Sequence, residues 1–172
     1  MPKISTFLWF NDQAEEAAKF YISVFKKNSK IVRIARYGEA GPGPKGSVMT
    51  VGFRLGGVEL TALNGGPHFK LTPAVSLVVS CTTQKEIDYF WRKLSSVPAA
   101  EQCGWLVDKY GLSWQIVPSF LGEVVGSKDA AKSNRVMAAL MPMKKLDLAT
   151  LKRAAAPAAS ISRAGRVTPP EG

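Results

Sequence analysis

The stretch TFLWFNDQAEEAAKFYISVF, residues 6–25, places a strand pattern directly before a helix pattern. Its first five residues are mostly aromatic or aliphatic, which predicts a buried strand over residues 6–10. Asp12 and Glu15 have the spacing of a capping box and predict the start of a helix over residues 13–27. Apolar side chains then recur at helical spacing and can lie on a sheet: Ala14, Ala17, Ala18, Tyr21, Val24 and Phe25.

More strand patterns complete this first unit. Gly56-Gly57 predicts a two-residue hairpin between two of them. The segment GEAGPGPKG, residues 38–46, predicts a mobile loop, because glycine and proline interrupt regular structure. The turn NGGP at residues 64–67 closes the unit. The predicted strands cover residues 30–37, 47–55 and 58–63.

The same order of patterns begins again about seventy positions later. Thr83 and Glu86 repeat the capping-box spacing, and Tyr21 is 70 residues from Trp91, as Ala17 is from Ile87. The chain therefore predicts an α+β fold of two tandem modules, residues 1–67 and 68–120, each with a strand and a helix followed by further strands. Strands of the second module are predicted over residues 74–79, 104–107 and 112–117, and its helix face holds Ile87, Phe90, Trp91 and Leu94.

A C-terminal helical extension is predicted over residues 121–153. Asp129 can cap a helix that runs through Met141 and ends at Pro142, and Asp147 can cap a shorter one through about Arg153. Residues 154–172 are rich in alanine, proline, serine and arginine, so we predict a disordered basic tail there.

The net charge of +10 is unevenly distributed along the chain. Residues 1–127 carry 14 basic and 10 acidic side chains, whereas residues 128–172 carry 9 basic and 3 acidic ones. This distribution favours a solvated basic tail over a nucleic-acid surface. Binding of nucleic acid remains a third functional hypothesis, and it predicts salt-sensitive DNA binding that is lost when residues 144–172 are deleted.

The composition also bears on location. Cys81 and Cys103 are too few for a disulfide scaffold, and their spacing fits no zinc motif, so we expect two reduced thiols. The sequence shows no apolar run of membrane-spanning length and no signal-peptide pattern. These features predict a cytoplasmic protein without a membrane partner.

Several phrases of the chain together resemble the PhnB-like branch of the vicinal-oxygen-chelate (glyoxalase) superfamily, which is often labelled "3-demethylubiquinone 3-methyltransferase-like". The resemblance covers about residues 3–153. It implies two tandem βαβββ modules that form a cupped mixed sheet, and it implies a homodimer. The label implies methyl transfer, but the sequence lacks a strand, Gly-rich turn and helix that would hold adenosylmethionine. The matching phrases are FLWF (7–10), AEEA (14–17), FY (20–21), RYGEAGPG (36–43), TALNGGPHF (61–69), QCGWL (102–106), DKYGLSWQIVP (108–118) and RVM (135–137).

The same resemblance implies where a metal would be held. Metal-using relatives take one ligand from the first strand and one from the last strand of each module. In this chain those places hold one carboxylate, one amide, one hydroxyl and an alanine or a second hydroxyl, a poor donor set for a transition metal. We therefore predict neither a metal nor another cofactor. The positions are Ser5, Ala74 or Ser76, Glu59 or Thr61, and Gln115.

Strand alternation predicts which side chains line the cup. Phe7 and Trp9 share a face with Ser5, although Trp9 could equally be a core residue, while Trp114 faces the core. Asn64 is expected to hold the 64–67 turn. The predicted ligand-binding residues are Phe7, Trp9, Tyr37, Thr61, Leu63 and Trp105, with Tyr37 and Trp105 at the rim and Glu59, Ser113, Gln115 and Val117 also facing the cavity.

Two main functional hypotheses follow from this cavity. The first is a module that binds a small planar or apolar molecule by stacking and burial. The second is a metal-free isomerase, lyase or hydrolase in which Glu59 or His68 is the base and Gln115 polarises a carbonyl oxygen. His68 could alternatively be a loop histidine that bonds to backbone. The predicted homodimer would use the 38–46 loop and apolar residues of helix 129–141, namely Val136, Met137, Leu140 and Met141.

Overall fold

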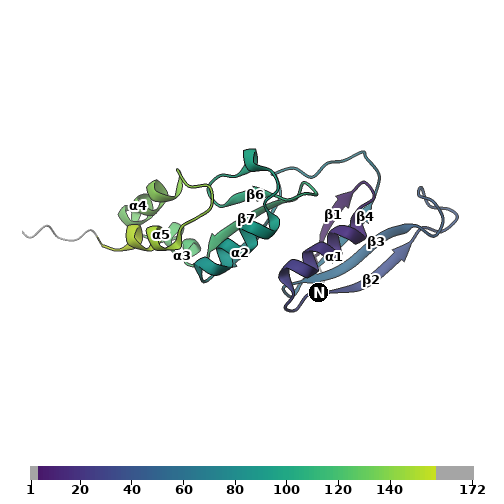
Figure 1. The fold of residues 1–172 in the computed structure, drawn as a ribbon, viewed down its shortest axis with the longest axis horizontal. Coiled ribbons are helices and arrows are strands. Elements are labelled where there is room, and N and C mark those ends of the chain that lie inside the picture. Colours follow the sequence, from purple (N-terminus) through teal and green to yellow (C-terminus); the bar gives the residue numbers. More distant parts are fainter. Residues whose placement is uncertain (1–3, 158–172) are drawn as a thin grey trace, which may run out of the picture.

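The computed structural model describes residues 4–157 as two α+β modules in tandem, followed by helices (Figure 1). The modules and the C-terminal helices follow one another along the long axis of the molecule. This architecture confirms the predicted tandem fold with C-terminal helices. No helix in the described part of the chain is both long and apolar enough to cross a membrane.

The first module contains a four-stranded mixed sheet in the order β1-β4-β3-β2. Strands β1 and β4 run parallel, and the other pairs are antiparallel. Gly56 and Gly57 have φ angles of 57° and 94°, so the hairpin between β3 and β4 turns as predicted. The elements are β1 (Thr6–Phe10), α1 (Ala14–Phe25), β2 (Lys30–Arg36), β3 (Val48–Leu55) and β4 (Val58–Asn64).

The second module repeats this plan with a three-stranded sheet in the order β5-β7-β6. Strands β5 and β7 run parallel, as β1 and β4 do. Between α2 and β6 the chain forms the short 3-10 helix η1 where the first module has β2, because Pro98 begins a helical turn there. The elements are β5 (Ser76–Cys81), α2 (Gln84–Leu94), η1 (Pro98–Ala100), β6 (Trp105–Val107) and β7 (Ser113–Pro118).

One aromatic core connects the two modules. The Tyr21 ring of α1 lies 5.4 Å from that of Trp114 on β7, and the Phe25 ring lies 4.9 Å from that of Phe90 on α2. The Tyr89 hydroxyl donates a hydrogen bond of 2.8 Å to the carbonyl oxygen of Val24. Trp114 is almost completely buried, which confirms its predicted place in the core.

The two helix starts differ in how they are capped. Thr83 and Glu86 form the predicted capping box at the start of α2. The prediction for α1 was wrong: its N-cap residue is Gln13, and no side chain of that segment caps it. Instead, Oδ1 of Asn64, at the end of β4, accepts a hydrogen bond of 2.7 Å from the Ala14 amide. A residue distant in sequence thus satisfies one of the free amides at the start of α1.

The C-terminal helices form their own small core against the end of the second sheet. Asp129 and Asp147 cap α4 and α5 as predicted. The amides of Cys103 and Gly104 donate to the carbonyl oxygens of Met143 and Lys144, which attaches this part to the second module. Helix α5 extends slightly into the segment expected to be disordered, and residues 158–172 lie outside the described part. The helices are α3 (Leu121–Val125), α4 (Ala130–Leu140) and α5 (Leu148–Ala155).

Candidate functional site

The first sheet has a covered face and an open face. Leu8 and Phe10 of β1 point under α1 and are buried, whereas the alternate residue Phe7 is 58% exposed. Trp9 is half-buried on the same side as Phe7. On the neighbouring strand β4, Glu59, Thr61 and Leu63 are also half-buried. The structure therefore gathers these predicted site residues on one uncovered sheet face.

The second sheet has a similar open face. Val78 on β5 is 57% exposed, and Nε2 of Gln115 on β7 donates a hydrogen bond of 2.9 Å to Oγ of Ser76. The Ser113 hydroxyl is buried without a hydrogen-bond partner among the described residues. Trp105 on β6 pairs with Gln115 and is half-buried. This face combines apolar side chains with a small group of neutral polar ones.

The two open faces do not form one cup within a single chain. No hydrogen-bonded strand pair joins the first sheet to the second in the described residues. Phe7, Trp9, Glu59, Thr61 and Leu63 lie on one sheet, while Trp105 and Gln115 lie on the other. Any site that uses both groups needs a further surface to bring them together.

An ion pair occupies the first open face. Nη2 of Arg54 lies 2.9 Å from Oε1 of Glu59, and both side chains are partly exposed. A shallow hollow of about 300 Å³ lies beside the pair, lined by Ser5, Val32, Arg33, Gly52, Phe53, Glu59, Leu60 and Thr61. The sequence analysis missed Arg54 as the partner of Glu59. The register of the Gly56-Gly57 hairpin pairs the two residues and could have revealed the contact.

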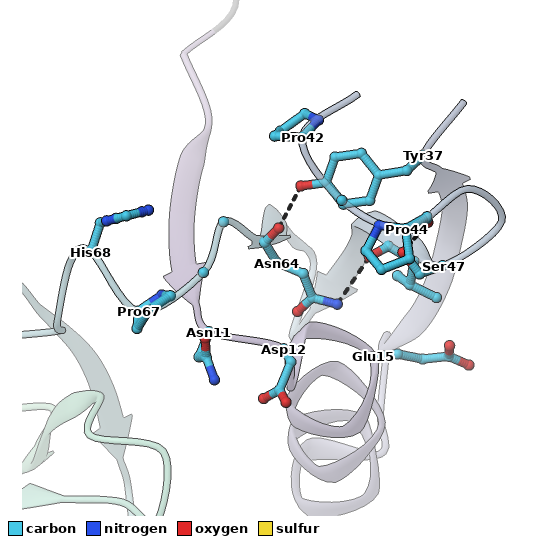
Figure 2. A pocket seen from close by; sticks show the side chains of 14 residues that line it. Asn11, Asp12, Glu15, Tyr37, Pro42, Pro44, Ser47, Asn64, Pro67 and His68 are labelled. Carbon is cyan, nitrogen blue, oxygen red and sulfur yellow. Dashed lines mark hydrogen bonds between the residues drawn. The ribbon is translucent and has the colours of Figure 1, made fainter. Parts of the chain in front are cut away.

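A larger cavity of about 640 Å³ lies at the end of the first sheet (Figure 2). It is bounded by the start of α1, the 38–46 loop and the 64–68 loop, so it lies beside the open face rather than on it. His68 and Tyr37 are in this cavity. The lining residues are Asn11, Asp12, Glu15, Tyr37, Pro42, Gly43, Pro44, Ser47, Val48, Asn64, Gly65, Gly66, Pro67 and His68.

Tyr37 is a fixed wall of this cavity. Its hydroxyl donates a hydrogen bond of 2.6 Å to the carbonyl oxygen of Asn64, as Figure 2 shows. A Cβ atom on Gly41 or Gly43 would lie 2.6 or 2.5 Å from the Tyr37 ring, so the loop packs closely around it. Tyr37 is therefore buried, and the expected position at the rim of the sheet face is not what the structure shows.

His68 and two carboxylates lie around the same cavity. His68 lines this cavity from the 64–68 loop, and no hydrogen bond joins its side chain to another of the described residues. Asp12 and Glu15 lie at the start of α1 (Figure 2). Lys19 lies 2.6 Å from Glu15, and its hydrogen bond lowers the pKa of that carboxyl below the ordinary value.

Trp9 connects the open face to the 64–68 loop. Its Nε1 donates a hydrogen bond of 2.9 Å to the carbonyl oxygen of Gly66. Its ring meets Phe69 edge-to-face, with 4.9 Å between the ring centroids. The indole is thus fixed at one edge while part of it remains open to the sheet face.

Gly65→Ala is expected to lower the free energy of unfolding by about 2 kcal/mol. The new Cβ would lie 2.2 Å from Cζ2 of Trp9, so the indole or the loop must move. Chemical denaturation followed by tryptophan fluorescence would measure the loss. Gly38→Ala is the matched control, since a Cβ there has no neighbour within 4 Å. Equal stability of the two variants would contradict a fixed Trp9.

The donors expected at the metal positions do not converge. Ser5 and Glu59 lie with the first sheet, whereas Ser76 and Gln115 lie on the second. Glu59 is paired with Arg54, and Gln115 is bonded to Ser76. In residues 4–157, no three histidine, cysteine, aspartate or glutamate side chains are grouped so that they could hold a metal ion.

Comparison with known proteins gives the following similarities. A family model described as 3-demethylubiquinone-9 3-methyltransferase matches residues 2–117. The structure of a putative 3-demethylubiquinone-9 3-methyltransferase, PhnB protein, from Bacillus cereus is 43% identical, covers 68% of this chain and 99% of its own, and has a TM-score of 0.57. A protein structure from Pseudomonas aeruginosa is 18% identical, covers 67% of this chain and 96% of its own, and has a TM-score of 0.51. This similarity supports the fold alone. No curated protein matches the chain.

Proposed function

This chain belongs to the PhnB-like, 3-demethylubiquinone-9 3-methyltransferase family of vicinal-oxygen-chelate type, and on that premise we propose that it binds a small organic molecule without a metal. The ligand would lie on the open face of the first sheet. The observation that carries this proposal is the exposure of Phe7 beside the half-buried Trp9, on a face that no helix within residues 4–157 covers.

The side chains on this face favour a planar, largely apolar ligand. Phe7 and Trp9 offer rings for stacking and burial, and Thr61, directly opposite Phe7 in the sheet, offers a hydroxyl. The opposite charges of Arg54 and Glu59 neutralise each other in an ion pair. A neutral ligand would leave that pair intact. We therefore propose a neutral aromatic or carbonyl compound as the ligand class.

A second copy of the chain would complete the binding site. Apolar side chains such as Phe7 and Val78 remain exposed on both sheets, and large exposed apolar surfaces are typical of interfaces. If the second sheet of one chain covers the first sheet of its partner, Gln115 faces Phe7 and Trp9 across a closed cavity. The predicted homodimer and the binding site are thus parts of one proposal. Of the helix residues expected at its interface, Val136 and Leu140 are buried in the chain itself.

Ligand binding can be tested with coumarin, a neutral planar carbonyl compound. We expect coumarin to raise the melting temperature of the protein, whereas zinc, nickel and manganese ions leave it unchanged. Phe7→Ala should weaken coumarin binding about tenfold, because one aromatic contact is worth about 1 kcal/mol beyond area burial. Val125→Ala, at an exposed site on α3, is the control. A coumarin affinity equal in both variants, or a metal-induced rise in melting temperature, would refute the proposal.

Catalysis is the second candidate function. Glu59 or His68 would be the base and Gln115 would polarise a carbonyl oxygen, but one chain places these three residues in different regions. Methyl transfer has less support. The connections before α1 and α2, Asn11-Asp12-Gln13 and Thr82-Thr83, hold no glycine that could let a nucleotide-like cofactor approach a helix start.

We also retain a cytoplasmic location as a proposal. Cys81 and Cys103 are both free thiols in the structure. Burial raises the pKa of the Cys81 thiol to about 11, which keeps it protonated and unreactive at neutral pH. Two unpaired cysteines suit a reducing compartment.

A further inference from the structure

The C-terminal helices carry an excess of positive charge outside the matched family segment. The family model ends at residue 117, before α3 begins at Leu121. Residues 128–157 hold seven basic side chains and only two acidic ones, Asp129 and Asp147. Both acids accept backbone hydrogen bonds as helix caps. The cations thus belong to a folded surface, whereas the sequence placed much of this charge in a solvated tail.

Five of these cations form what we call the basic ridge: Lys128, Lys132, Arg135, Lys152 and Arg153. Lys132 and Arg135 stand three residues apart on α4 and so share one side of it. Arg135 reaches α5, where its Nε and Nη2 each donate a hydrogen bond of 3.1 Å to the carbonyl oxygens of Ala154 and Ala156. Lys152 and Arg153 lie in that same last turn of α5. The Arg135 side chain of α4 therefore lies at the end of α5 that carries Lys152 and Arg153.

The cations of the basic ridge form no salt bridge among residues 4–157, although the Asp147 carboxylate is near enough to interact electrostatically with Arg153 and Asp129 caps α4 beside Lys132. Lys145 pairs with Asp88 at 2.6 Å and is excluded from the ridge for that reason. Arg135 bonds only to carbonyl oxygens, and Arg153 bonds to the hydroxyl of Thr150. In residues 4–157, Lys128, Lys132 and Lys152 have no carboxylate within ion-pair distance. The two carboxylates leave a net excess of positive charge in this region, and such an excess suits a polyanion.

We propose that the basic ridge binds the phosphate backbone of double-stranded DNA without reading its sequence. Lys132 and Arg135 lie about 4.5 Å apart along the axis of α4 at 1.5 Å per residue. Duplex DNA presents about two to three phosphate charges over that length of its axis. Contacts of this kind depend on charge and position rather than on base edges.

Other polyanionic surfaces fit this region less well. Insertion into an anionic membrane would need a broad exposed apolar face, but Val136, Leu140 and Leu151 are buried in one core. Among the described residues of α4, its C-cap and α5, only Met137 and Met141 are exposed large apolar side chains. Single-stranded nucleic acid is held by stacking on exposed rings. The one aromatic ring in residues 119–157, Phe120, packs on that same core.

The test compares the full-length chain with two triple variants that remove equal charge. The ridge variant is Lys132→Gln, Lys152→Gln and Arg153→Gln. It leaves Arg135 unchanged, so that the hydrogen bonds of Arg135 to the carbonyl oxygens of Ala154 and Ala156 are preserved. The control variant is Lys27→Gln, Lys30→Gln and Lys93→Gln, at exposed cations of the two modules. Fluorescence anisotropy with a labelled DNA duplex, measured over a range of salt concentrations, reports affinity and salt dependence.

We expect micromolar or weaker binding of the natural chain that falls steeply with salt. The ridge variant should bind DNA at least about tenfold more weakly. Its plot of log binding constant against log salt concentration should have a slope that is smaller by about two to three, since each lost phosphate contact lowers the slope by about 0.9. The control variant should bind as the natural chain does. Absence of salt-sensitive binding, equal losses in both variants, tighter binding to a single strand, or preference for phosphatidylserine vesicles would each overturn the proposal.

Discussion

Asp108→Ala is expected to lower the free energy of unfolding by about 3 kcal/mol, because it removes a buried carboxylate that holds three hydrogen bonds. Oδ1 of Asp108 accepts from the amides of Tyr110 and Leu112 at 2.8 and 3.1 Å. Oδ2 accepts from Nε1 of Trp114 at 2.8 Å. Alanine would leave these three donors without a partner in a region closed to water.

The loss would also affect the contact between the two modules. The turn that Asp108 holds carries Lys109 and Tyr110, both of which bond to Glu16 on α1. The Tyr21 hydroxyl of α1 lies beside Asp108, buried and without hydrogen-bond geometry to any described residue. Burial and the nearby Asp108 charge raise the pKa of that phenol, so Tyr21 stays neutral. Asp108 thus stabilises both its own turn and the surface against which α1 packs.

Asp108→Asn distinguishes the effect of the side chain's shape on stability from the effect of its charge, because asparagine has nearly the same shape but no charge. Asparagine can keep one oxygen for the two backbone amides, but its NH₂ group would face the Trp114 N–H, donor against donor. We therefore expect a loss of about 2 kcal/mol even for this near-isosteric change. Urea denaturation at a fixed protein concentration measures both variants. Glu123→Ala, at an exposed carboxylate on α3, should change stability little. A loss for Asp108→Asn no larger than for Glu123→Ala would contradict this role.

The contribution of Asp108 to the free energy of unfolding should decrease with rising pH. Burial raises the pKa of this carboxyl above its usual range, although the three donors oppose the shift. The folded chain then holds the proton more tightly than the unfolded chain does. Its contribution to stability falls as the pH rises from the ordinary aspartate pKa of about 3.9 through the raised value, and it is constant above that. The Asp108→Asn variant should lack this slope.

Local signals in the sequence were sufficient for most of the fold. Thr83 and Glu86 lie within one helical turn, so their capping box could be predicted from spacing. The cap of α1 could not be predicted in this way, because Asn64 reaches Ala14 from 50 residues away. The same limit applied to Tyr37, whose burial depends on the packing of the 38–46 loop over its ring. Tertiary contacts decided both cases.

For the candidate site, alternation predicted the orientation of side chains but not the surfaces they meet. Alternation predicted that Phe7, Thr61 and Gln115 face a shared cavity; in the structure Phe7 is exposed and Thr61 and Gln115 are half-buried, on two separate sheets. Period-two alternation contains no information on how far apart two sheets lie. The separation of the two faces within one chain therefore appears only in the structure. Which surface covers each open face depends on how copies of the chain assemble.

Val78→Glu is expected to convert a dimeric chain into a monomer. The side chain of Val78 is 57% exposed on the open face of the second sheet, where the proposed partner would bury it. A carboxylate buried there without a counter-charge should cost about 3 kcal/mol or more, which raises the dimer dissociation constant at least about a hundredfold. Light scattering across a dilution series measures this shift, and circular dichroism confirms that the monomer remains folded.

The chain offers a closely matched control for this change. Val125 on α3 is 59% exposed, so Val125→Glu alters the same side chain at equal exposure but away from both sheet faces. It should leave the dimer intact. If the natural chain is monomeric at micromolar concentration, or if both variants dissociate equally, the proposed pairing of the sheets is wrong. Loss of coumarin binding in Val78→Glu, a residue on the opposite sheet from Phe7, would show that the second copy forms part of the binding site.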